Sequence, residues 1–230
     1  MRSEILIVLT LIAALPARGD AVSDLRAVLA RFRGRDPLAV SIEMTRSRHS
    51  KGRFVNDDFE GSAAVRVEED AAGLRVTLAR ALLDRAATDS TVSKTLAELV
   101  PASVASVIDF APVLATMLNG ARLIERSSRS FALALPPAAN SDAELGGVTS
   151  HEDHLRISLG PDGVPVSARR VRKGSAGALF IRVDTVRTES WDLAVYGDHL
   201  VATRTDDASI VSGPMQNGRA ETVWIVRVLR

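Results

Sequence analysis

Apolar and polar residues alternate with a period of two in many segments of this chain, and this pattern constrains the fold more than any other feature. In residues 38–45 the apolar set is Leu38, Val40, Ile42 and Met44. A period of two puts alternate side chains on opposite faces, so each such segment is a strand with one buried face. The other segments with strand character are 63–67, 74–78, 122–126, 130–135, 155–159, 164–172, 179–188, 191–196, 200–204 and 222–229.

Short polar turns separate several of these segments. Residues 69–73 and 161–163 are examples that contain Asp and Gly, and such short connections join antiparallel neighbours. Residues 47–58 are polar and basic, and we expect them to form a solvated hairpin loop. The chain therefore predicts about nine or ten antiparallel strands.

Helical patterns interrupt the strands in two regions. Residues 25–32 carry apolar side chains on one face of an amphipathic helix. In the middle of the chain, 82–86 and 92–100 suggest short helices, and 101–118 is strongly apolar with Asp109 as its only charged residue. Two prolines interrupt this last segment and it is too short to span a bilayer, so we expect helices buried against the sheet.

These patterns predict a mainly β (α+β) fold. Most strands are apolar on one face only, which is typical of an antiparallel sheet covered on that side. A sheet of this breadth twists and curls. We therefore expect a strongly curved antiparallel sheet or incomplete β-barrel, with the helices covering its concave face.

The first residues have the layout of a signal peptide. An apolar run occupies 5–15, Arg2 precedes it, and small residues at 17, 19 and 21 allow cleavage after Gly19 or Ala21. The run is long enough for a signal peptide but too short to cross a membrane; an N-terminal core helix is the alternative. We expect residues 1–21 to be removed, leaving 22–230 as one periplasmic domain.

Composition narrows the classes of partner. The chain has 29 Lys and Arg against 28 Asp and Glu, a net charge of +1, so no overall field attracts nucleic acid or anionic lipid. We expect no nucleic-acid binding and no stable membrane insertion. The chain has no cysteine, which excludes disulfides and a lipid-modified N-terminal cysteine.

The order of these segments resembles the periplasmic lipoprotein carriers and sorting proteins, the LolA and LolB-like group. A signal peptide is followed by residues 20–26 opening a short helix, then by strands, an apolar helical middle and a strand meander. Within that meander, residues 155–163 (LRISLGPDG) resemble the late hairpin of the family.

The resemblance implies an incomplete barrel whose apolar interior receives acyl chains, with the helices as a lid and without catalysis or a cofactor. It implies an arginine that latches the lid, for which Arg46 is the nearest candidate; a solvated arginine at a strand end is the alternative. The side chains expected to line the cavity are Val40, Ile42, Met44, Val65, Val76, Val107, Phe110, Leu114 and Met117.

Signals for catalysis or metal binding are weak. His151 and His154 are a conceivable zinc pair, but residues three apart on a strand point to opposite faces, so a polar strand entrance is the simpler interpretation. Residues 174–177 (GSAG), expected in a loop, lack the spacing of a serine nucleophile elbow. We expect no enzyme activity, no metal and no cofactor.

Two functional hypotheses follow. In the first, the chain is a non-enzymatic periplasmic binding or carrier protein for a lipid-like or other hydrophobic ligand, such as a lipid or lipoprotein acyl chain. Residues 104–118 provide the apolar surface for this, although they could equally complete a dry core. In the second, the chain is a cell-envelope accessory module without a ligand, which docks a protein partner through a strand edge or the basic loop 46–53.

Overall fold

The structure is a computed structural model that describes residues 21–52, 56–136, 148–178, 181–214 and 216–229. Apart from Ala21, the predicted signal peptide lies outside the described residues. The helices are α1 (Ala21–Leu29), α2 (Arg80–Thr88), α3 (Ser90–Leu96), α4 (Pro101–Ile108) and α5 (Phe110–Met117). The strands are β1 (Leu38–Gly52), β2 (Asn56–Asp70), β3 (Gly73–Leu78), β4 (Arg122–Arg126), β5 (Ser130–Ala134), β6 (Val148–Leu159), β7 (Pro165–Ala178), β8 (Ile181–Tyr196), β9 (His199–Gly213) and β10 (Gln216–Val228).

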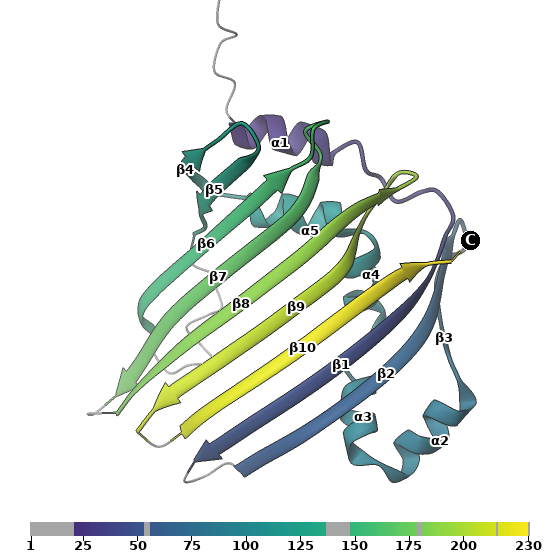
Figure 1. The fold of residues 1–230 in the computed structure, drawn as a ribbon, viewed down its shortest axis with the longest axis vertical. Coiled ribbons are helices and arrows are strands. Elements are labelled where there is room, and N and C mark those ends of the chain that lie inside the picture. The colour runs from purple at the N-terminus through teal and green to yellow at the C-terminus, as the bar shows by residue number, and fades with distance from the viewer. Residues whose placement is uncertain (1–20, 53–55, 137–147, 179–180, 215, 230) are drawn as a thin grey trace, which may run out of the picture.

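All ten strands form one antiparallel sheet in the order β3-β2-β1-β10-β9-β8-β7-β6-β5-β4 (Figure 1). The first and last long strands, β1 and β10, are paired in the middle, from Val40 opposite Val228 to Gly52 opposite Gln216. The sheet is not closed, because β3 and β4 lie at its two edges. The prediction of a mainly β, antiparallel protein with additional helices is therefore confirmed.

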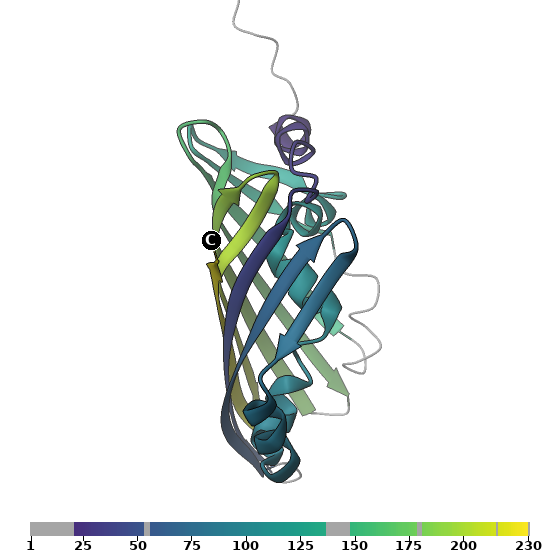
Figure 2. The ribbon, with the colours of Figure 1, turned by 90° about the vertical axis from the view of Figure 1, so that its right-hand side faces the viewer.

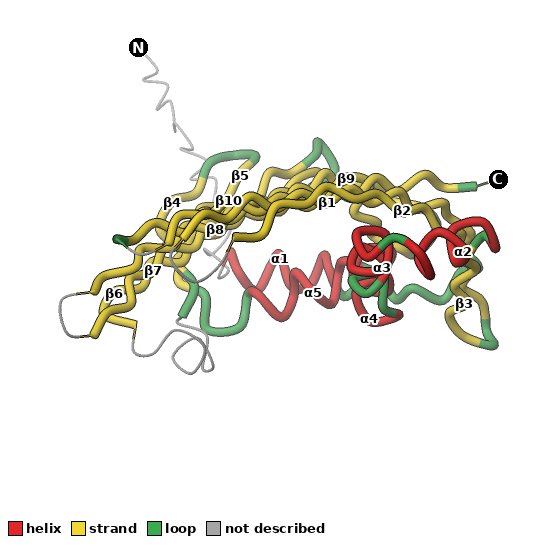
Figure 3. Tube along the Cα trace, turned by 90° about the horizontal axis from the view of Figure 1, so that it is seen from below, coloured by secondary structure: helices red, strands yellow, loops and turns green. Residues whose placement is uncertain are grey.

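The helices lie on one face of the sheet, which we call the helix-side face (Figure 3). The topology explains this position: the chain leaves β3 at one edge and must reach β4 at the other, so α2 to α5 cross the sheet between them. Helix α3 contacts β2, α4 and α5 contact β9, and α1 packs on α5. Figure 2 shows β2, β3 and the α2–α3 pair from the side.

The core lies between this face and the helices. Phe110 of α5 is buried, and its ring centroid lies 5.2 Å from that of Trp191 on β8. Leu114 and Leu118 are fully buried, as are Ile42 on β1 and Ile157 on β6. Burying a large apolar side chain contributes about 1.5–3 kcal/mol, so the apolar middle of the chain holds the two layers together.

Several expected boundaries are wrong. Residues 47–58 are not a loop, because β1 and β2 pair as far as Lys51 opposite Asn56. Within this segment, residues 53–55 lie outside the described residues. Segments 179–188 and 191–196 belong largely to one strand, β8, and residues 174–177 lie within β7. In each case the hydrogen-bonded ladder extends a strand beyond its apolar part, where composition no longer indicates it.

Candidate functional site

The residues expected to line a cavity are gathered on or against the helix-side face, but most form packed core. Seven of them are buried: Val40, Ile42, Met44, Val65, Val107, Phe110 and Leu114. The remaining two, Val76 and Met117, are partly buried against the same cluster. These side chains stabilise the contact between the sheet and the helices, and Met44 also borders an open groove.

This groove lies where α2 meets the sheet at β1 and β2, and we call it the α2 groove. Its volume is about 560 Å³, within the range of about 300–1,000 Å³ typical of small-molecule pockets. Six of its lining residues are apolar: Met44, Ala63, Ala64, Ala79, Ala81 and Leu82. Thr45, Ser62 and the charged residues Glu43 and Arg85 complete the lining. Residue Leu83 of α2, adjacent to this lining, is 48% exposed.

A polar link joins the helical cover to the sheet beside α3. Nη1 of Arg46 on β1 lies 2.6 Å from Oε1 of Glu98, in the segment between α3 and α4. The Arg46 guanidinium also lies 5.4 Å from the ring centroid of Phe59, and Lys94 of α3 lies 5.3 Å from it. Arg46 thus connects the sheet with the helices, the geometry that a lid latch requires.

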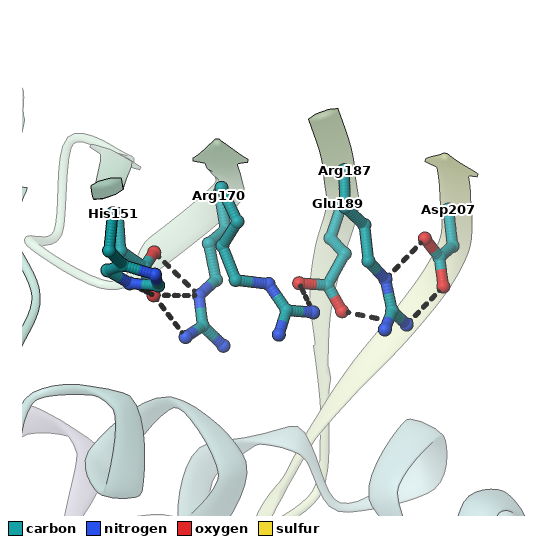
Figure 4. A network of polar contacts seen from close by, with 7 residues as sticks. His151, Arg170, Arg187, Glu189 and Asp207 are labelled. Atoms are coloured by element: carbon teal, nitrogen blue, oxygen red, sulfur yellow. Dashed lines mark hydrogen bonds and ion pairs between the residues drawn. The ribbon is translucent and has the colours of Figure 1, made fainter. Parts of the chain in front are cut away.

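A chain of buried and half-buried charges crosses the helix-side face where the apolar rows end (Figure 4). Its members share the face of core residues on the same strands: Ala168 is followed by Arg170 and Arg172 on β7, and Trp191 by Glu189 and Arg187 on β8. We call these residues the charged network: Asp153, Arg170, Arg172, Arg187, Glu189 and Asp207.

Each charge of the network has an opposite partner. The Asp153 side chain is fully buried and accepts a hydrogen bond from Nε of Arg170 at 2.9 Å and another from Nη2; this bonding raises the pKa of Arg170. Arg172 and Arg187 lie directly opposite each other on β7 and β8, an unfavourable arrangement for like charges. Glu189 offsets it, with one oxygen 2.9 Å from Arg172 Nη2 and the other 3.4 Å from Arg187 Nη2.

A second polar cluster lies at the other end of the sheet, around His199. This side chain is fully buried, and its Nε2 lies 2.6 Å from the carbonyl oxygen of Asp36. Oε2 of Glu69 lies 4.0 Å from His199 Nδ1, and burial raises the pKa of Glu69 while His199 opposes the rise. Burial also raises the pKa of Asp109, between α4 and α5, again against the effect of His199.

The histidine pair of β6 does not converge. His151 continues the helix-side row of Asp153, and its Nε2 lies 3.9 Å from Asp153 Oδ2. His154 stands between Asp153 and Leu155 on the strand and so faces the opposite side. Within the described residues, no group of three His, Cys, Asp or Glu side chains could hold a metal ion.

The basic loop expected to dock a partner is also different in the structure. Residues 46–52 belong to β1, and Arg46 and Arg48 alternate in phase with Met44, so they face the helices rather than a free loop. Residue 53 lies outside the described residues.

A scan of family models, a search of curated proteins and a search of solved structures each found no match to this chain. Among the described residues, no helix combines the length and apolar character needed to span a membrane.

Sequence reasoning missed the charged network. A signal was present, because charged residues continue the apolar phase of several strands at i+2 spacing, as in Ala168, Arg170 and Arg172. However, the register between neighbouring strands decides which charged residues form pairs. This register could not be derived from the sequence pattern.

Proposed function

We propose that this chain is a non-enzymatic periplasmic carrier that holds a lipid-like or other hydrophobic ligand between a curved sheet, shaped as an incomplete β-barrel, and its helical cover. The α2 groove is the observation that carries this proposal. It places exposed apolar surface beside helices that are attached to the sheet partly through polar contacts. An acyl chain entering there could extend along the core if the α2–α3 pair moved outward.

The Arg46–Glu98 pair then acts as a latch on the cover. Both side chains are partly exposed, at 23% and 48%, and an ion pair of this kind contributes at most about 1 kcal/mol. A latch of this strength favours the closed form without locking it. If a ligand binds only the open form, the free energy of opening reduces its apparent affinity. Removal of the latch lowers this free energy, so the apparent affinity rises.

Binding of the fluorescent probe N-phenylnaphthylamine tests the proposal. Ala63→Leu, which fills the α2 groove, should weaken binding by about tenfold. Glu98→Gln should strengthen it by up to about fivefold. Matched controls are Ala87→Leu, an exposed position of α2 outside the groove lining, and Asp206→Asn, which breaks the exposed Arg204–Asp206 pair away from the groove. No probe binding by the native chain, or equal effects of variants and controls, would refute the carrier function.

One observation favours docking of a protein partner as a second candidate. The edge strand β4 is exposed along its length, including Leu123 at 38% and Ile124 at 54%, and an exposed edge can pair with a strand of another chain. If docking is the function, Ile124→Lys should abolish capture of an envelope partner by a tagged chain. The docking hypothesis fails if Ile124→Lys leaves capture unchanged.

A further inference from the structure

A second groove lies on the helix-side face, at the end of the sheet where β1, β7 and β9 finish. It consists of two cavities of about 230 and 240 Å³ that share Ser209 and Val211 of β9. The register places a row of small or apolar residues across its floor: Gly174, Thr185, Val211, Gly218 and Ser50. We call it the arginine groove.

Cationic side chains border this floor. Arg172 and Arg187 line the first cavity, and Arg46 and Arg48 line the second. No Asp or Glu is among the residues lining either cavity. The acids that pair with Arg172 and Arg187, Glu189 and Asp207, stand one row nearer the core. The groove therefore presents arginines to whatever enters it.

Several buried polar atoms in the groove have no hydrogen-bond partner within the described residues. Nε of Arg172 and Nε2 of His151 are buried without a hydrogen bond in the first cavity. Ser50 borders the second, is only 5% exposed, and its Oγ has no hydrogen bond. Arg48 has one ion pair among the described residues, to Asp57 at 3.7 Å, which is too long for a hydrogen bond.

A buried donor without a hydrogen bond destabilises the folded protein unless a ligand or a water molecule accepts a hydrogen bond from it. An anionic oxygen group is the complement of arginine N–H donors. A phosphate suits this groove better than a carboxylate does, because it offers more oxygens to donors arranged on several strands. The distance from β7 to β1 is roughly 20 Å from strand spacing alone, and the floor between the arginines is apolar or small. Such a groove fits an elongated ligand with an anionic head and an apolar part.

We propose that the first cavity of the arginine groove binds the phosphate group of an amphipathic ligand, with Arg172 and His151 contacting the phosphate oxygens. The assignment of a lipid as the source of this phosphate rests on the proposed carrier function. The anion site itself does not, because Arg172 and His151 are neither in the lining of the α2 groove nor in the Arg46–Glu98 latch.

Calorimetric titration of the signal-free chain tests the proposal with three probes: dihexanoylphosphatidylglycerol below its micelle concentration, inorganic phosphate, and uncharged dihexanoylglycerol. His151→Gln and Arg172→Gln should each weaken binding of the phospholipid by about tenfold. Arg66→Gln, which removes one positive charge from the opposite face next to Glu68, should leave it unchanged. Circular dichroism verifies folding. If Arg172→Gln unfolds the chain, His151→Gln decides, because Nε2 of His151 has no hydrogen bond within the described residues.

The outcomes separate the two proposals. Phosphate-dependent binding lost in His151→Gln supports the anion site, and the inorganic phosphate arm shows whether a free ion suffices. Equal binding of phospholipid and uncharged dihexanoylglycerol, unaffected by the His151 and Arg172 substitutions, would overturn the anion site and leave a hydrophobic carrier standing. Phosphate binding without any binding of N-phenylnaphthylamine would refute the carrier function and leave the anion site.

Discussion

The Asp153–Arg170 pair shows that a charge buried on this face of the sheet requires an opposite charge beside it. Asp153 has no exposed side-chain surface and Arg170 is 16% exposed, so neither is compensated by bulk water. A buried charge left without its partner is strongly unfavourable, whereas the intact pair contributes little by itself. The pair therefore holds β6 to β7 in a single register.

We predict that Asp153→Asn lowers the free energy of unfolding by about 3 kcal/mol, because Arg170 remains charged and half-buried. Urea denaturation measures this change. The control is Arg227→Gln, which breaks the exposed pair with Glu43 and should cost less than about 1 kcal/mol. Equal effects of the two substitutions would show that Asp153 is hydrated.

The cluster around His199 predicts a pH dependence whose sign is set by burial. Burial raises the pKa of Asp109 above 3.8, its value in the unfolded chain, so the folded protein binds this proton more tightly. The stabilisation from this group is complete below pH 3.8 and is lost as the pH rises through the raised pKa. The groups that face Asp109 are Glu69 of β2 and the adjacent residues Asp198 and His199, from two other parts of the chain.

Asp109→Asn should not lose stability through this group as the pH rises. The free energy of unfolding of the variant, compared with that of the native chain, should therefore increase as the pH is raised from 3.8 towards neutral. Denaturation at a series of pH values measures the difference. Asp84→Asn, on an exposed part of α2, provides the control and should give a curve parallel to that of the native chain. A constant difference between Asp109→Asn and the native chain would contradict the burial argument.

Helix α3 depends on a close backbone approach to β2. A Cβ atom added to Gly61 would lie only 2.3 Å from Oγ1 of Thr95, which is fully buried in α3. No side chain is tolerated at this distance without movement of the helix. The glycine therefore sets how closely the α2–α3 pair can close on the sheet.

Gly61→Ala should displace α3 and destabilise its packing by about 1–3 kcal/mol. Hydrogen exchange should become faster at residues 90–96 and stay unchanged in β8 and β9, because the main contacts of α3 are with β2, α2 and β1. Addition of Thr95→Ala removes the clashing hydroxyl and should partly restore the slow exchange. Uniformly faster exchange in every strand would mean that Gly61 matters for the whole sheet instead.

The elements differ in how far the sequence predicts them. The apolar halves of β1, β2 and β9 were predictable. Leu38 and Val65 belong to period-two patterns with a buried phase, and Leu200 begins a continuous apolar run that is buried. Their far halves were not, because polar residues such as Arg48 and Ser209 carry no such contrast. The break at Asp109 was also unforeseen, although the nearby prolines indicated interrupted helices. The two grooves depend on register and on helix placement, which are tertiary properties.

The whole molecule is built on one sheet whose two faces differ in polarity. The helix-side face changes along the strands from apolar core to charged network to arginine groove, whereas the opposite face carries exposed ion pairs such as Glu43–Arg227 and Arg204–Asp206. An amphipathic ligand would match this gradient, with its chain towards the core and its head among the arginines. Both proposals therefore concern the same face and differ in the part of the ligand that they address.

The proposed carrier function requires a hydrophobic ligand in the space between the sheet and the helices. Native mass spectrometry of the chain purified without detergent tests this most directly. We expect a reproducible added mass in the range of a lipid, which is lost on denaturation and reduced in Ala63→Leu. A single peak at the mass of the bare chain in repeated preparations, together with no uptake of added lipid, would refute the carrier function.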